Sequence, residues 1–141
     1  MTKSRVLILL LLLPLAIEDL LTGRLFLPWI CLAGTAGFLL RLAGGDLSLP
    51  ELLCSLFPGI CLLGIAHFLK AVGTGDAVLT AAIGLTAGFG LTAGILFWGA
   101  LLCAAAGIAC MIFWHKPGNY RLPFAPFLLM GFFVCLSMES I

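Results

Sequence analysis

Residues 91–114 read LTAGILFWGALLCAAAGIACMIFW and contain no charged side chain. A helix needs roughly 20 apolar residues to cross the hydrocarbon core of a bilayer, which is about 30 Å thick. The rest of the chain has a similar character, because 63% of its 141 residues are hydrophobic and only 9% are charged. A soluble domain of this composition would leave large apolar patches in water. The sequence therefore predicts an integral membrane protein.

Charged residues, prolines and glycines divide the chain into six apolar segments. We expect these segments at residues 5–20, 25–43, 51–70, 76–89, 91–114 and 124–139. The polar pieces between them are too short to form a separate domain. The sequence thus predicts an all-α fold: a polytopic membrane protein of about six transmembrane helices in one bundle, with residues 1–141 as a single domain.

A glycine-rich repeat, at residues 84–94, marks the break that we place within the long apolar stretch 76–114. It contains the spacings Gly84/Gly88 and Gly90/Gly94. Small residues four apart allow helix backbones to approach closely in a membrane. We interpret these glycines as packing positions rather than as a ligand site.

The polar residues exclude several classes of function. The seven basic residues are scattered singly, so no nucleic-acid site is expected. The six cysteines lie in apolar runs, and neither they nor His67 and His115 have the spacing of metal ligands. We therefore expect no bound metal and no cofactor.

Two aspartates are the candidate functional residues, because ionisable groups within or beside a membrane span are costly. Asp19 closes the first apolar segment and Asp76 opens the fourth. One return crossing lies between them, so both carboxylates are expected on the same membrane face. Taken alone, each is most simply an interfacial carboxylate, and Asp76 suits a helix N-terminus. When two carboxylates are held close together, one keeps its proton while the other is an anion. They then supply the acid and the base that activate water.

The residues before Asp76 strengthen this interpretation. Asp76 ends the sequence Gly73-Thr74-Gly75-Asp76, directly after the third apolar segment. Glycines at these positions permit backbone angles and close approach that other residues obstruct. A phosphate-binding loop does not fit, because no lysine follows and no strand precedes it.

At these residues the chain resembles the GxGD aspartyl proteases, and within them the type IV prepilin peptidase family. Three segments carry the resemblance over nearly the whole chain: Asp19-Leu-Leu-Thr-Gly-Arg24 with Pro28, Gly73-Thr-Gly-Asp76-Ala-Val-Leu with Ala81-Ala-Ile-Gly84, and Leu122-Pro-Phe-Ala-Pro-Phe-Leu128. The chain departs from the family pattern where Trp29 follows Pro28 in place of the usual asparagine. It also lacks the lysine that commonly follows GxGD.

The resemblance implies a membrane-embedded aspartic endopeptidase that cleaves the leader peptides of prepilin- or pseudopilin-like precursors at the cytoplasmic face of the cell membrane. Asp19 and Asp76 would be its catalytic residues, and Gly73, Thr74 and Gly75 its active-site loop. Its partners would be the precursor peptide and the lipid bilayer. Longer members carry a cytoplasmic insertion with paired CxxC motifs and methylate the product, whereas this chain is similar to the short, peptidase-only forms.

Two other classes of function remain open from the residues alone. A small proton- or cation-coupled transporter or channel subunit would use the same carboxylates as a relay. A structural assembly subunit would leave both aspartates replaceable. The charge bias favours a cytoplasmic position for the aspartates by a small margin, because four basic residues share their face: Arg24, Lys70, Lys116 and Arg121, against Lys3, Arg5 and Arg41 on the other.

Overall fold

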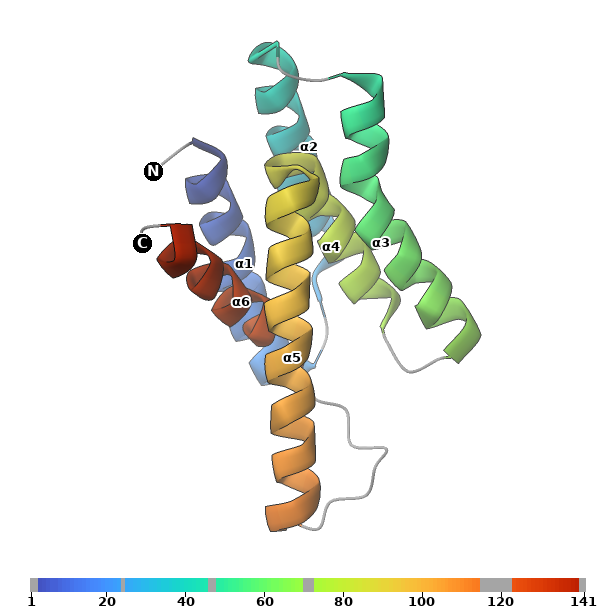
Figure 1. Ribbon diagram of the computed structural model, residues 1–141, viewed down its shortest axis with the longest axis vertical. Helices are drawn as coiled ribbons and strands as arrows, with labels where there is room; N and C mark the ends of the chain where they lie inside the picture. The colour runs from blue at the N-terminus through green and yellow to red at the C-terminus, as the bar shows by residue number, and fades with distance from the viewer. Residues whose placement is uncertain (1–2, 24, 46–47, 70–72, 115–122, 140–141) are drawn as a thin grey trace.

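A computed structural model describes residues 3–23, 25–45, 48–69, 73–114 and 123–139 of the chain. These residues form six α-helices and no strand (Figure 1): α1 (Lys3–Thr22), α2 (Leu27–Ala43), α3 (Leu49–Leu69), α4 (Thr74–Ala87), α5 (Phe89–Trp114) and α6 (Ala125–Glu139). The all-α prediction is confirmed, and every helix end lies within two residues of the corresponding predicted segment end.

The helices differ in their capacity to cross a membrane. Within the described part of the chain, two helices are both long and apolar enough for a crossing, over Leu49–Phe68 and Phe89–Phe113. The apolar helices Leu27–Ala43, Thr74–Ala87 and Ala125–Met138 are shorter. Six helices are therefore found, whereas six complete crossings remain a prediction.

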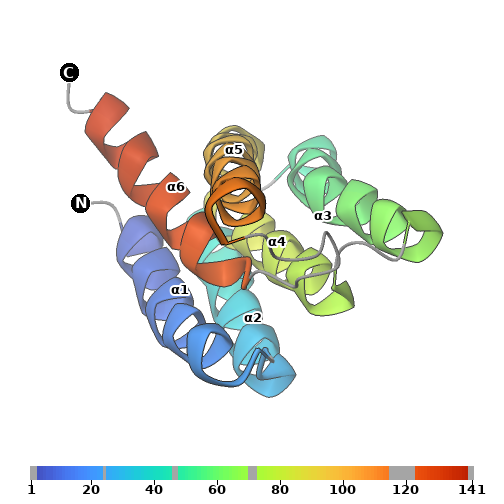
Figure 2. The same ribbon diagram turned by 90° about the horizontal axis from the view of Figure 1, so that it is seen from below.

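Helix α4 has a central position in the bundle, where it packs against α1, α2, α3 and α5. Helices α5 and α6 form a second close pair, and α6 also packs along α1 (Figure 2). Small residues permit the close approach around α4. A Cβ atom added at Gly34 would lie 3.0 Å from Cβ of Ala82, and one at Gly59 would lie 2.6 Å from Cβ of Ala81.

The glycine repeat has several roles rather than one. Gly84 packs against the backbone carbonyl of Ser55, and Gly94 lies close to Sγ of Cys135, so the packing prediction is confirmed for these two. Gly88 instead ends α4, because its φ of 84° is in the left-handed region that favours glycine. The packing prediction is wrong for Gly90, because no atom would lie within 4 Å of a Cβ added there.

Arg41 of α2 fixes the end of α4 that is remote from Asp76. Its guanidinium donates hydrogen bonds to the carbonyl oxygens of Gly84 and Leu85, at 3.5 and 3.4 Å, and to Oγ of Ser55 at 3.4 Å. The last carbonyls of a helix lack intrahelical partners and favour a cation nearby. One side chain thus joins α2, α3 and α4.

The interior is built from apolar side chains of α1, α2, α4, α5 and α6. In α1 the buried side chains recur with helical spacing, which places them on one face: Ile8, Leu11, Leu12 and Leu15. Large apolar side chains also cover the outside of the bundle. On α5 these include Phe97, Leu101, Ile108 and Ile112. An apolar exterior of this kind suits a lipid environment better than water.

Candidate active site

Asp19 lies one turn before the end of α1 and is buried, with only 7% of its surface exposed. Its carbonyl oxygen accepts a hydrogen bond of 2.9 Å from the N–H of Gly23. Gly23 has a φ of 62°, the left-handed conformation with which glycine commonly ends a helix. The glycine four residues after Asp19 therefore has a structural reason: it stops α1 directly beyond the carboxylate.

The carboxylate of Asp19 caps the start of α6. Its Oδ2 accepts a hydrogen bond of 3.0 Å from the backbone N–H of Ala125, in the buried interior. The first N–H groups of a helix have no intrahelical acceptor. Pro126 has no N–H, and the next N–H, that of Phe127, is bonded to the carbonyl of Phe124 at 3.1 Å. At the start of α6, Asp19 thus accepts the hydrogen bond of the Ala125 N–H, which has no acceptor within the helix.

Asp76 lies in the first turn of α4 and is partly buried. Its N–H bonds to the carbonyl of Gly73 at 3.1 Å, which begins the helix. The hydroxyl of Thr80 donates to the Asp76 carbonyl at 2.8 Å, one turn further along. The backbone on both sides of Asp76 is therefore fixed by hydrogen bonds.

The two predicted carboxylates lie at the same end of the bundle, Asp19 in the last turn of α1 and Asp76 in the first turn of α4. Packing of α1 against both α4 and α6 brings them there. Figure 1 shows the end of α1 and the start of α4 on the same side of the bundle, whereas their position on one membrane face remains a prediction.

Gly73 and Gly75 provide space beside these side chains. A Cβ atom added at Gly73 would lie 3.2 Å from Oδ2 of Asp76, and one at Gly75 would lie 3.2 Å from Cδ1 of Leu25. The expectation of close approach is confirmed. The expectation of unusual backbone angles is wrong, because Gly73 has ordinary extended angles, φ −70° and ψ 140°, and Gly75 lies within α4 without a positive φ. Thr74 begins α4 and is exposed.

Two further residues belong to the site although the sequence analysis assigned them no role. Ala125 donates a hydrogen bond to Asp19, and Leu25 lies against Gly75. The prolines at 123 and 126 were a usable signal for Ala125, because they mark a helix start with few donors. Leu25 lies in an apolar stretch that carries no such signal.

The remaining polar residues stand apart from this arrangement. Glu18 is partly exposed on α1, and His67 is exposed near the end of α3. No three His, Cys, Asp or Glu side chains gather as metal ligands among the residues that the structure describes. His115 lies outside the described residues, as do the four basic residues that were assigned to the face of the aspartates.

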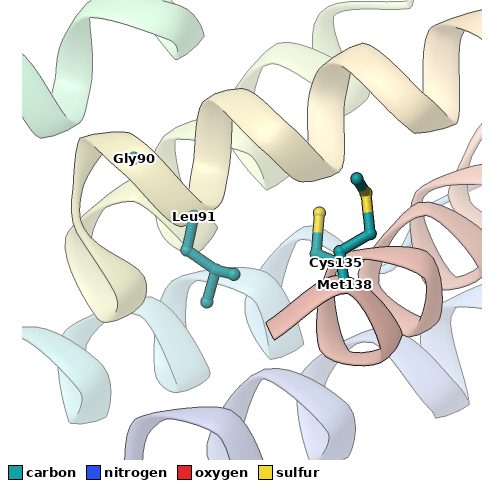
Figure 3. Close-up of a pocket in the computed structure, with 4 residues that line it drawn as sticks. All are labelled: Gly90, Leu91, Cys135 and Met138. Atoms are coloured by element: carbon teal, nitrogen blue, oxygen red, sulfur yellow. The ribbon is translucent and has the colours of Figure 1, made fainter. Parts of the chain in front are cut away.

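An apolar pocket of about 230 Å³ lies elsewhere, between the start of α5 and the end of α6 (Figure 3). Gly90, Leu91, Cys135 and Met138 line it. It contains neither aspartate, so we treat it as separate from the candidate active site.

Comparison of the chain with family models, with curated proteins and with solved structures finds no match. The resemblance to the prepilin peptidases therefore rests on the motif residues, and the function stated below is a proposal.

Proposed function

We propose that the protein is a membrane-embedded aspartic endopeptidase in which Asp19 and Asp76 together activate water against a peptide bond. The observation that carries the proposal is the convergence of the two aspartates at one end of the bundle, Asp19 near the end of α1 and Asp76 in the first turn of α4, which packs on α1. Two carboxylates held close together ionise in turn, so that one remains an acid while the other is an anion.

The contacts of each aspartate suit different parts of this chemistry. Asp19 has one oxygen, Oδ2, held by the Ala125 N–H, which fixes the position of its carboxylate and leaves the other oxygen for water. The Asp76 side chain lies against Gly73, where the absence of a Cβ leaves room beside its Oδ2. An anion draws a proton from water while the neutral acid protonates the leaving amine.

By the motif resemblance, the substrate is a prepilin- or pseudopilin-like precursor with a basic leader before an apolar helix. We propose a multi-pass location in the cell membrane, with about six helices in the bilayer and the aspartates on the cytoplasmic side. A cysteine placed at Thr74, which is exposed at the start of α4, tests the orientation. Labelling of that cysteine by an impermeant reagent added to intact cells would contradict it.

The direct test is incubation of the purified protein, reconstituted in vesicles, with a candidate prepilin. Mass spectrometry should find the leader and the mature peptide with the wild type and neither with Asp76→Ala. Loss of a function at Asp76 would also be expected of a transporter, so proton flux is measured in the same vesicles. Flux that depends on Asp76 without any cleavage would favour the transporter and refute the peptidase.

A further inference from the structure

The end of the bundle opposite the aspartates carries a partly buried cation. Arg41 lies in the last turn of α2. Its Nη1 donates hydrogen bonds to the carbonyl oxygens of two α4 residues and to the hydroxyl of one α3 residue, at 3.4–3.5 Å: Gly84, Leu85 and Ser55. These distances exceed the usual range of about 2.7–3.2 Å, so the hydrogen bonds are weak. All three acceptors are uncharged groups, and none of them neutralises the guanidinium.

Most of the hydrogen-bonding capacity of Arg41 is unused within the described part of the chain. A guanidinium has five N–H donors, on three nitrogens. The hydrogen bonds that Arg41 makes with described residues all come from Nη1, which leaves Nη2 and Nε without an acceptor there. Nη2 lies beside the turn between α4 and α5, because a Cβ atom added at Gly88 would lie 3.5 Å from it. The free donors are therefore at the start of α5.

Among the residues that the structure describes, no carboxylate forms an ion pair with Arg41. Glu51 lies one turn before Ser55 on α3, but its side chain is exposed, and its Oε2 accepts a hydrogen bond of 3.3 Å from the N–H of Ser48. A partly buried charge without an opposite charge is costly, particularly in or beside a membrane. The described contacts of Arg41 thus leave a place for an anion.

An apolar pocket opens close to these free donors. It is the pocket of about 230 Å³ between the start of α5 and the end of α6, and we call it the α5–α6 pocket. Its first lining residue, Gly90, lies within about 8 Å of Gly88, because successive Cα atoms are about 3.8 Å apart. Figure 3 shows Leu91 of α5 and Cys135 and Met138 of α6 on facing sides of the pocket. A Cβ atom added at Gly90 would have no atom within 4 Å, so the space beside this glycine is open.

The surface around Arg41 and Gly88 is apolar. The residues on both sides of Arg41, Leu40 and Leu42, are about half exposed, as is Phe89 at the start of α5. A soluble anion would gain nothing from these side chains or from the α5–α6 pocket. A lipid would use both, because its phosphate pairs with a cation at the membrane boundary while its acyl chain contacts apolar side chains.

We propose that Arg41 and the α5–α6 pocket together bind one anionic phospholipid from the leaflet opposite the aspartates. The lipid phosphate accepts hydrogen bonds from Nη2 and Nε of Arg41, and one acyl chain lies in the pocket beside Gly90. Such a lipid joins the ends of α2, α4, α5 and α6. The proposal goes beyond the peptidase and is independent of it, because lipid binding requires neither aspartate.

Binding is measured by native mass spectrometry of the full chain in detergent micelles, titrated with dioleoylphosphatidylglycerol. We expect one lipid to remain bound at saturation. Dioleoylphosphatidylcholine should bind about tenfold more weakly, because its choline cation offsets the phosphate charge. Glycerol phosphate, which is the headgroup without acyl chains, should show no binding at the same concentrations, because burial of the acyl chain supplies much of the affinity. Glycerol phosphate binding as tightly as the lipid would indicate a site for free phosphate and overturn the proposal.

Three variants test the two halves of the site, each first confirmed as helical by circular dichroism. Arg41→Gln keeps an N–H donor for the α4 carbonyls but removes the charge, and should weaken binding of phosphatidylglycerol about 10- to 100-fold. Lys3→Gln is the matched control, because it removes one positive charge at the start of α1, at the same end of the bundle. It should change binding less than about twofold.

Gly90→Leu places a side chain in the open space of the pocket and favours the helix, so this variant should fold at least as well as the wild type. It should weaken lipid binding about tenfold by occupying the place of the acyl chain. Binding that is unchanged in Arg41→Gln or in Gly90→Leu would overturn the proposal. An equal loss in Lys3→Gln and Arg41→Gln would also overturn it, because attraction to the general positive charge of this end would then explain the binding.

Discussion

Substitution of Asp19 separates the two roles that the structure gives this residue. Its carboxylate caps α6 through the Ala125 N–H, and it is one half of the proposed catalytic pair. Asp19→Asn keeps an oxygen that can accept the same hydrogen bond, whereas Asp19→Ala removes the acceptor. Both substitutions remove the ionisable carboxyl group, which is the acid or base of the proposed catalytic pair. The two variants should therefore differ in stability and agree in their loss of cleavage.

The stability difference follows from the buried hydrogen bond. Without an acceptor, the Ala125 N–H is left unsatisfied in the interior, at a cost of about 1–3 kcal/mol, with an additional contribution of about 0.3–1 kcal/mol from the helix dipole. For Asp19→Asn the weaker, neutral hydrogen bond is offset by a lower desolvation penalty, because no charge is buried. We expect a change within about 1 kcal/mol for Asp19→Asn.

Unfolding is followed by circular dichroism in detergent micelles, and cleavage by mass spectrometry of a precursor in vesicles. Cleavage should be undetectable for both variants. Asp19→Ala should be less stable than Asp19→Asn by about 1–3 kcal/mol. Equal stability of the two variants would refute the capping role. Cleavage by Asp19→Asn at close to the wild-type rate would refute the catalytic role.

Other changes test the surroundings of the pair. Gly73→Ala places a methyl group 3.2 Å from Oδ2 of Asp76 and should slow cleavage about 10- to 100-fold, whereas Gly64→Ala, with open space around it, should leave the cleavage rate unchanged. Arg41→Ala removes the cap from the far end of α4 and should lower stability by about 1 kcal/mol, with cleavage per folded protein retained. Excess EDTA should not alter the cleavage rate, because the proposed chemistry uses carboxylates and water; inhibition that added zinc reverses would contradict this.

Much of the fold was predictable because an apolar chain offers few ways to end a helix. Gly23 and Gly88 have positive φ where α1 and α4 stop, and the prolines at 28 and 126 lie in the first turns of α2 and α6. The charge and glycine pattern therefore predicted helix ends to within two residues. The number of complete crossings could not be predicted in the same way. Helix α4 is as apolar as a membrane span, but its 14 residues are fewer than the roughly 20 that a crossing needs.

The site was predictable as a pair of residues and not as a set of contacts. Counting crossings placed Asp19 and Asp76 at one end without any knowledge of packing. The hydrogen bond from Ala125 to Asp19 joins residues 106 positions apart, and only the packing of α6 against α1 creates it. Gly73 was correctly selected, but for space beside a carboxylate rather than for its backbone angles.

The central claim is that Asp19 and Asp76 act as one catalytic unit, and a double-mutant comparison tests it most directly. Cleavage of one reconstituted precursor is measured with wild type, Asp19→Asn, Asp76→Asn and the double variant, each confirmed as folded and membrane-inserted. Because a coupled pair loses its whole function when either member is lost, we predict that each single variant is as inactive as the double variant. Measurable residual cleavage in both single variants, lost further and multiplicatively in the double variant, would show that the two carboxylates act independently and would contradict the account.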